Sequence, residues 1–343
     1  MFKNKKEYHS EINNGIQILR MILSFLVVHL HCYNFRKKKS KILIFFRLAR
    51  YFYVPIFYII SYYFTFKILK FINIKKIKLR FQRLLIPYII WPSIFYLLNI
   101  IKYYYFGGKK YLFKDLFIQF ITGKRIHGVF WFQCNLILSF ILLNIIMILF
   151  KNNNYLLIIQ FVGIAAYFYF NCHYYYHLFD SYIYEIESLI QDFSKVLFLS
   201  SLGISLASFF YYNEFIKYRK NIIFFSLFNI YLIHDISNLV KEYYYLKLIL
   251  IGLGSMSIFA IFLLIPCNNI KSKLVNYIII QITNYTGGIY YLHPKIRDYI
   301  IPKIKIIKNG SLIACLLNYI ICYFSCFFGS KIFRNSKLKY LFN

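Results

Sequence analysis

Long runs of apolar residues, separated by short polar or basic segments, repeat along the whole chain. Runs of about twenty apolar residues are long enough to cross a bilayer as helices, which satisfy their own backbone hydrogen bonds there. The pattern predicts an all-α, polytopic transmembrane helix bundle of about ten spans, folded as a single domain over residues 1–343. The expected spans are 16–35, 42–66, 84–105, 128–150, 155–170, 196–212, 221–240, 246–266, 274–292 and 311–329.

Prolines and connecting segments add detail to these spans. Pro55 falls inside the second span, where it should kink the helix. A strongly basic connector is expected at 67–83, before the third span. Pro87 and Pro92 are expected near the start of that span, because proline suits the first turn of a helix. A longer polar loop is expected at 105–127.

The composition indicates a membrane protein and limits the classes of partner that it is expected to bind. Hydrophobic residues make up 60% of the chain, and the net charge is +31. In a soluble protein this charge would suggest nucleic acid, but here Lys and Arg lie mainly between apolar runs. The expected partners are therefore the lipid bilayer, with its anionic head groups, and anionic substrates, not nucleic acid. Lys and Arg are divided evenly between the two expected sides, so charge does not fix the orientation.

The first expected span carries ionisable residues that a simple anchor would lack. Arg20 lies inside the apolar run, and His31 follows eleven residues later. In an α-helix this separation is three turns plus about 20°, so both side chains leave the same face about 16 Å apart. Gln17 and Ser24 fall near that face, whereas His29 points away. Such residues inside a membrane are costly, which makes the face a candidate functional site. The alternative is an arginine that reaches the interface and a histidine hydrogen-bonded to a neighbouring helix.

Other titratable residues give weaker signals. The seven cysteines show no metal-binding spacing, and no metal site is expected. The segment 171–192 holds histidines and carboxylates without Lys or Arg, and composition favours a solvated loop over a cation or acceptor site. Glu185, Glu187 and Asp192 in this segment are candidates for an acidic partner of His31.

Five segments, taken in order, resemble the integral-membrane acyltransferase family 3. They are the Arg20–x10–His31 pair, VPIFYIIS at 54–61, RxxRLLIPY at 80–88, VFWF at 129–132 and GGIYYLHP at 287–294. The resemblance covers roughly residues 15–330, and the Arg20/His31 pair is its most specific part. It implies an O-acyltransferase that moves an acyl group, most often acetyl, from acyl-CoA to a hydroxyl of a carbohydrate or another small acceptor. Acyl-CoA would be a cosubstrate, with no tightly bound cofactor.

The resemblance also implies roles for particular residues. His31 corresponds to the residue that is taken as catalytic in the family, and Arg20 corresponds to its partner toward the donor side. The resemblance also implies that the N terminus lies in the cytoplasm. Imidazole suits a general base, because its pKa lies near working pH. Arg20, Arg80 and Arg83 are expected to hold the nucleotide end of acyl-CoA, since its phosphates need fixed cations.

Four further positions depart from the family pattern or leave two interpretations open. Ser61 is followed by Tyr62, where the family commonly has glycine. His127 lies four residues before Trp131, either as a shifted counterpart of a family histidine or as an interfacial residue. Trp131 is expected to be an interfacial or packing aromatic. His293 has either a structural or a catalytic role.

Two other functions fit parts of the sequence. A transporter or flippase for a charged or sugar-linked solute would explain prolines and charge inside spans. A catalytically inactive relative is the third possibility. In each case the chain is expected to be a multi-pass integral membrane protein, with the cell membrane as the expected location.

Overall fold

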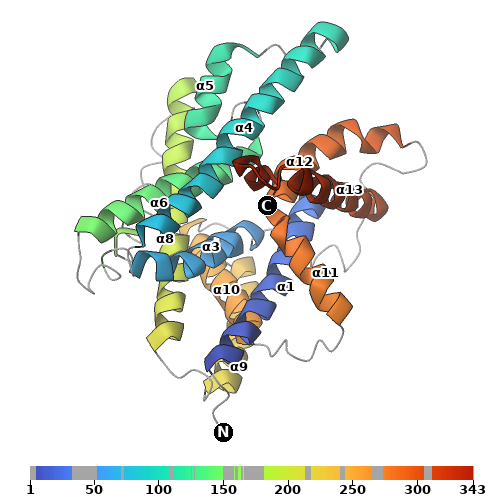
Figure 1. The fold of residues 1–343 in the computed structure, drawn as a ribbon. Helices are drawn as coiled ribbons and strands as arrows, with labels where there is room; N and C mark the ends of the chain where they lie inside the picture. Colours follow the sequence, from blue (N-terminus) through green and yellow to red (C-terminus); the bar gives the residue numbers. More distant parts are fainter. Residues whose placement is uncertain are drawn as a thin grey trace. The chain divides into compact units, whose positions relative to one another are not determined.

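The computed structural model of the chain describes residues 5–32, 52–70, 73–107, 111–124, 126, 128–149, 158, 161–163, 165, 181–212, 218–239, 244–264, 273–304 and 311–342. Within these ranges every regular element is a helix, which confirms the all-α prediction (Figure 1). The α-helices are α1 (Lys5–Cys32), α3 (Tyr53–Lys70), α4 (Ile74–Phe106), α5 (Phe113–Thr122), α6 (Trp131–Leu149), α8 (Ser181–Tyr212), α9 (Arg219–Leu239), α10 (Tyr244–Leu264), α11 (Lys273–Asn284), α12 (Thr286–Tyr299) and α13 (Leu312–Ile332). Short 3-10 helices lie at Gly128–Phe130, Ile301–Lys303 and Lys337–Leu341.

Several of these helices could cross a membrane. Five helical segments in the described part of the chain have the length and apolar composition of a span: Asn14–Cys32, Ile74–Tyr105, Gly128–Ile146, Leu189–Phe210 and Leu312–Ile332. Three apolar helices are shorter: Tyr53–Phe66, Ile249–Leu264 and Leu274–Asn284. The number of about ten spans is therefore not confirmed within the described residues. The expected span 155–170 lies almost entirely outside them.

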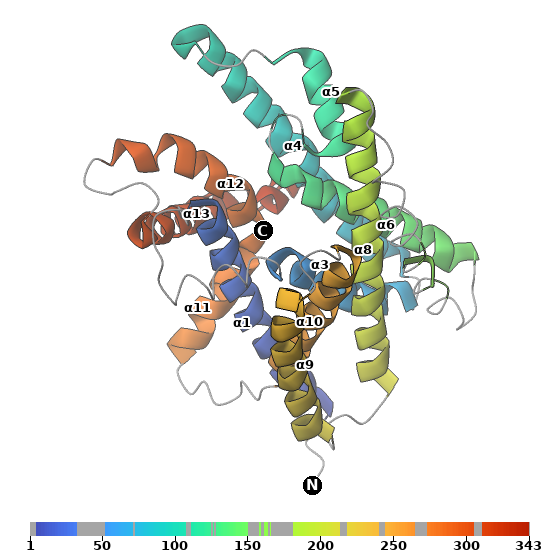
Figure 2. The same cartoon turned by 180° about the vertical axis from the view of Figure 1, so that it is seen from behind.

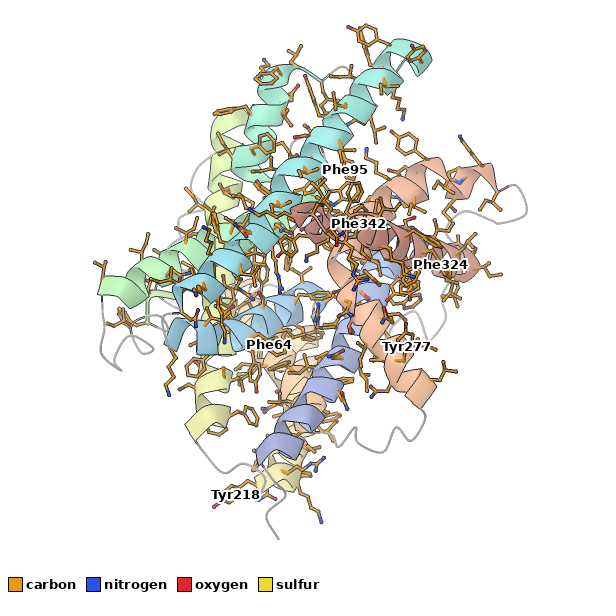
Figure 3. The ribbon with its side chains drawn as sticks, in the orientation of Figure 1. Phe64, Phe95, Tyr218, Tyr277, Phe324 and Phe342 are labelled. Atoms are coloured by element: carbon orange, nitrogen blue, oxygen red, sulfur yellow. The ribbon has the colours of Figure 1, made fainter. Side chains whose placement is uncertain are left out.

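The chain forms two compact units. The first unit comprises Met1–Ile60 and Asn213–Asn343, and the second comprises Ser61–Tyr212. In the first unit α1 packs against α10, α11, α12 and α13, as the views from the front and from behind both show (Figures 1 and 2). Large aromatic side chains such as Tyr277 and Phe324 stay exposed on the outer sides of α11 and α13 (Figure 3). Exposed apolar surface of this kind is typical of a protein that contacts lipid.

The expected single span 274–292 is wrong in one respect, because the helix breaks at Tyr285 and continues to Tyr299. The Thr-Gly-Gly sequence that follows the break is a poor helix former. A methyl group at Gly288 would lie 2.5 Å from Cys326 Sγ and 2.6 Å from Phe342 O, so glycine lets α12 approach α13 closely. The break is thus favoured both by local propensity and by packing.

Boundaries in the second unit also differ from the prediction. Helix α4 begins at Ile74 and not at residue 84, because Asn73 caps it by accepting a hydrogen bond of 3.0 Å from Lys76 N. Pro87 and Pro92 consequently lie inside the helix and not near its start. The expected loop 105–127 contains helix α5, whose polar residues Asp115, Gln119 and Thr122 are buried.

Two smaller expectations are corrected as well. Pro55 is the third residue of α3 and therefore lies in its first turn. A backbone N–H in the first turn has no partner within the helix, so a proline there does not kink it. In the expected acidic loop 171–192, residues from 181 onward are helical, since Ile183, Ile186 and Ile190 repeat with the period of a helix face. The rest of that segment lies outside the described residues.

The C-terminal end of the chain packs onto α12 and α13. The Phe342 ring stacks on the Phe333 ring, with centroids 5.9 Å apart and an interplanar angle of 9°.

Gly288→Ala is expected to lower the free energy of unfolding by roughly 1–3 kcal/mol, because the added methyl group would meet backbone and sulfur atoms. Thermal unfolding in detergent measures this loss, and Gly128→Ala is the matched control, since a Cβ at Gly128 meets nothing within 4 Å. Equal unfolding midpoints for the two variants would contradict the close approach.

Candidate active site

The polar face of α1 meets the break between α11 and α12. Nη2 of Arg20 donates hydrogen bonds to Thr283 O at 3.1 Å and to Thr286 Oγ1 at 2.9 Å. One turn earlier, Gln17 Oε1 accepts a hydrogen bond of 2.8 Å from Thr283 Oγ1. Arg20 and Gln17 therefore fix the two threonines that flank Tyr285.

The arginine is well suited to this place. Thr283 O belongs to the last turn of α11, where carbonyl groups have no partner within the helix and carry the negative end of the helix dipole. A guanidinium supplies both a hydrogen bond and a positive charge to such a carbonyl. Arg20 thus stabilises the broken helix, whatever further role it has toward a substrate.

At the other end of the face, two histidines meet. The rings of His31 on α1 and His293 on α12 have centroids 5.0 Å apart and an interplanar angle of 41°. His31 is exposed, whereas His293 is fully buried. Nδ1 of His293 lies 3.2 Å from Ile289 O, one turn back on its own helix. Because a carbonyl only accepts, Nδ1 is the protonated nitrogen in this hydrogen bond, and Nε2 of the neutral ring is an acceptor.

Arg297 holds the backbone at this end of α1. Its Nη1 donates a hydrogen bond of 2.9 Å to His31 O, and its Nε donates one of 2.7 Å to Asp298 Oδ1. The hydrogen bond to Asp298 raises the pKa of Arg297 above its ordinary value. Since α1 ends at Cys32, Arg297 caps its last turn as Arg20 caps α11. A permanent cation therefore lies beside the exposed histidine.

The structure confirms the shared face of Arg20 and His31, whereas Ser24, expected near that face, contacts a different helix. Arg20 and His31 both face the α11–α12 pair. His29 is buried and has its ring centroid 6.2 Å from that of Phe25, which fits the expected packing role. Ser24 is turned toward α13, where its Oγ lies 2.7 Å from Tyr319 Oη.

The second unit holds the other basic residues that the sequence singled out. Arg80 Nη2 donates hydrogen bonds to Ser61 O at 2.9 Å and to Ser61 Oγ at 2.6 Å, and its guanidinium lies 5.6 Å from the centroid of the Phe140 ring. The expected residues Arg80 and Ser61 thus contact one another and join α4 to α3. Arg83, one turn further along α4, has an exposed side chain.

The remaining predicted residues are not brought to these contacts. Trp131 is the first residue of α6 and is half-buried, with its ring centroid 6.4 Å from that of Phe132. Its backbone packs against Gly123, where a Cβ would lie 2.6 Å from Trp131 Cα. The role of its ring as an interfacial or packing aromatic stays a prediction. His127 lies outside the described residues.

One acidic candidate is used elsewhere. Asp192 Oδ2 lies 2.5 Å from Lys124 Nζ, and its Oδ1 lies 3.4 Å from Lys195 Nζ, within the second unit. The side chains of Glu185 and Glu187 lie outside the described part. Among the side chains that the structure describes, no group of three or more His, Cys, Asp or Glu residues is placed to hold a metal ion.

Sequence reasoning missed three residues of the first unit that support the histidines. Arg297 caps α1 beside His31, and Thr286 accepts from Arg20. Asn318 on α13 is fully buried and donates a hydrogen bond of 3.0 Å to His293 O. Asn318 could have been singled out from the sequence, because an amide inside the apolar run 311–329 needs a hydrogen-bond partner within the membrane.

Comparison with known proteins shows the family of the chain. A family model described as an acyltransferase domain, that of acyltransferase family 3, matches residues 13–339. No curated protein and no solved structure matches the chain. The match includes α1 with Arg20 and His31, the α11–α12 pair and α13. The chain therefore belongs to acyltransferase family 3 and is an integral-membrane acyltransferase.

Proposed function

We propose that the protein is an O-acyltransferase that moves an acyl group, in the first place acetyl, from acyl-CoA to a hydroxyl of a carbohydrate or another small acceptor. His31 is the general base. The observation that carries this proposal is an exposed imidazole at the end of α1, packed 5.0 Å from the buried ring of His293. The proposed location is the cell membrane.

The reaction needs one proton transfer and one acyl transfer. His31 accepts the proton of the acceptor hydroxyl while that oxygen attacks the thioester carbonyl. The carbon–sulfur bond then breaks, an ester forms, and the CoA thiolate leaves and takes up a proton. An exposed histidine suits the base because both acceptor and thioester must reach it.

His293 supports this base from the protein side. Its ring is held through Nδ1 by Ile289 O, which leaves Nε2 as an acceptor. A base that is oriented by a second, fixed group is the general arrangement of acid–base sites. In this proposal His293 is a positioning residue for His31, through the contact between the two rings.

The donor carries several phosphate charges, and the basic residues are its proposed contacts. Arg83, Arg80 and Arg20 are each a candidate contact for the phosphates of acyl-CoA, to be tested one at a time. The side chain of Arg83 is exposed; Arg80 donates to Ser61, and Arg20 donates to Thr283 O and Thr286 Oγ1. Arg83 is thus the first of the three to test for donor affinity.

The experiment is acyl transfer by the purified protein in nanodiscs. Labelled acetyl-CoA is mixed with mono- and oligosaccharides, and alkali-labile label in the saccharide is measured, since O-esters are cleaved by base. We expect base-labile label in at least one saccharide, and less transfer as the acyl chain is lengthened. If the thioester of acetyl-CoA stayed intact with every hydroxyl-bearing acceptor, the result would contradict the proposal. It would favour the interpretation that the protein is a catalytically inactive member of the family.

A further inference from the structure

Asn318 is a buried amide in the middle of an apolar helix. It lies on α13 and is fully buried, between the leucine, tyrosine and isoleucine residues that give this helix its hydropathy. Its Nδ2 donates hydrogen bonds to His293 O at 3.0 Å and to Cys32 Sγ at 2.9 Å. Its Oδ1 accepts one of 3.3 Å from Cys322 Sγ on its own helix. One side chain therefore bonds to three helices at once.

The two outward contacts fall beside the two histidines. His293 O is the backbone carbonyl of the residue whose ring meets His31. Cys32 is the residue that follows His31 and the last residue of α1. The last residues of a helix fray unless they are held. Arg297 binds His31 O, and Asn318 binds the Cys32 side chain, so this helix end is held at two successive residues.

We propose that Asn318 is a positioning residue for the His31–His293 pair. By binding Cys32 and His293 O through one amide group, it sets the distance and the tilt between the two rings. Groups that carry out catalysis must be held within about 0.5 Å of their productive geometry, and a shift of about 1 Å can lower the rate about 100-fold. This inference rests on the proposed function, because it assigns Asn318 a role in that reaction.

A neighbouring residue provides the matched control. Tyr319 follows Asn318 on α13 and also joins α13 to α1, through its contact of 2.7 Å with Ser24 Oγ. Ser24 lies seven residues before His31, about two helical turns away. Tyr319→Phe therefore removes a hydrogen bond between the same two helices at a distance from the histidines.

The experiment measures kcat and KM for acyl transfer together with thermal unfolding. We expect Asn318→Ala to lower kcat about 10- to 100-fold with the KM for acyl-CoA changed less than about 3-fold, and Tyr319→Phe to keep kcat within about 3-fold. A double-mutant cycle separates positioning from general destabilisation. In a His293→Ala background, Asn318→Ala should lower kcat by less than about 3-fold further, because the ring that it positions is already absent.

Two results would overturn the inference. One is a kcat of Asn318→Ala equal to that of Tyr319→Phe, and the other is the same loss from Asn318→Ala with and without His293. If Asn318→Ala does not fold, Cys32→Ala is measured in its place. We expect this variant to lower kcat about 3- to 10-fold, and an unchanged kcat would contradict the inference. If wild type transfers and His31→Ala does not, while Asn318→Ala matches wild type, the inference fails and the proposed function stands. Equal transfer by wild type and His31→Ala removes the proposed function itself.

Discussion

Replacing His31 with alanine is expected to lower the rate of acyl transfer about 100-fold or more, the range in which a general base contributes to catalysis. The side chain is exposed, so its removal leaves no buried cavity and the protein should fold as before. The loss should appear in kcat, because the base acts in the chemical step and not in binding of acyl-CoA. Initial rates at saturating donor, given per amount of folded protein, measure it.

His29→Ala is the control for this prediction. It removes the same side chain two residues away on the same helix, but this ring is buried, with its centroid 6.2 Å from that of Phe25. Its removal can reduce stability through a cavity. The rate per folded molecule should nevertheless stay within about 3-fold of wild type. The opposite result, in which His29→Ala is inactive and His31→Ala is active, would place the catalytic face on the wrong side of α1.

Replacing Arg20 with alanine is expected to affect both stability and transfer. The change removes the two hydrogen bonds from a charged donor to Thr283 O and Thr286 Oγ1, at the point where the helix breaks. A buried acceptor that loses a charged partner costs about 1–3 kcal/mol, so the free energy of unfolding should fall by about 2–5 kcal/mol. Transfer should fall with it, because α12 carries His293 only eight residues beyond Tyr285.

Two further variants show which part of Arg20 matters. Arg20→Lys keeps a positive charge but not the planar fork that reaches two acceptors, so its unfolding midpoint should lie between wild type and Arg20→Ala. Thr286→Val keeps the shape of Thr286 and removes the hydroxyl that accepts from Arg20 and donates to Thr283 O, while the charged bond from Arg20 to Thr283 O remains, so the loss should be smaller than in Arg20→Ala. The midpoints come from thermal unfolding in detergent. A wild-type midpoint for Arg20→Ala would show that the arginine does not stabilise the break.

The face of α1 could be predicted from the sequence because helical geometry alone determines it. Eleven residues bring Arg20 and His31 to one side of a helix whatever surrounds it. The partner on that side was not predictable in the same way. His293 reaches His31 only because α12 packs against α1, and such packing between distant segments leaves no periodic signal.

The break at Tyr285 shows why continuous hydropathy was misleading. Apolar residues run through 274–292, and hydropathy alone treats them as one span. The contacts beside the break, Gly288 with Cys326 and Phe342 and Arg20 with Thr283 O, are tertiary contacts that hydropathy does not report. Arg297 was overlooked for a related reason, since it lies outside the apolar run and acts on a helix end far away in sequence.

Arg80 has a structural contact that was not expected from the sequence. Its guanidinium, a candidate contact for phosphate, is bound to Ser61 and lies over the Phe140 ring. This arrangement depends on how α3 and α4 pack, which the sequence around Arg80 does not reveal. Arg83, three residues later, has an exposed side chain, and its contact with phosphate stays a prediction.

Whether His31 takes part in acyl transfer, and not in solute movement, is tested most directly by counting both products in proteoliposomes. Free CoA thiol and acylated acceptor are measured in the same sample, together with acceptor that has crossed the membrane unmodified. We expect equal amounts of thiol and ester with wild type, and neither above background with His31→Ala. Acceptor that crosses while the thioester stays intact, or ester that forms at the same rate without the His31 imidazole, would contradict the proposed role of this residue.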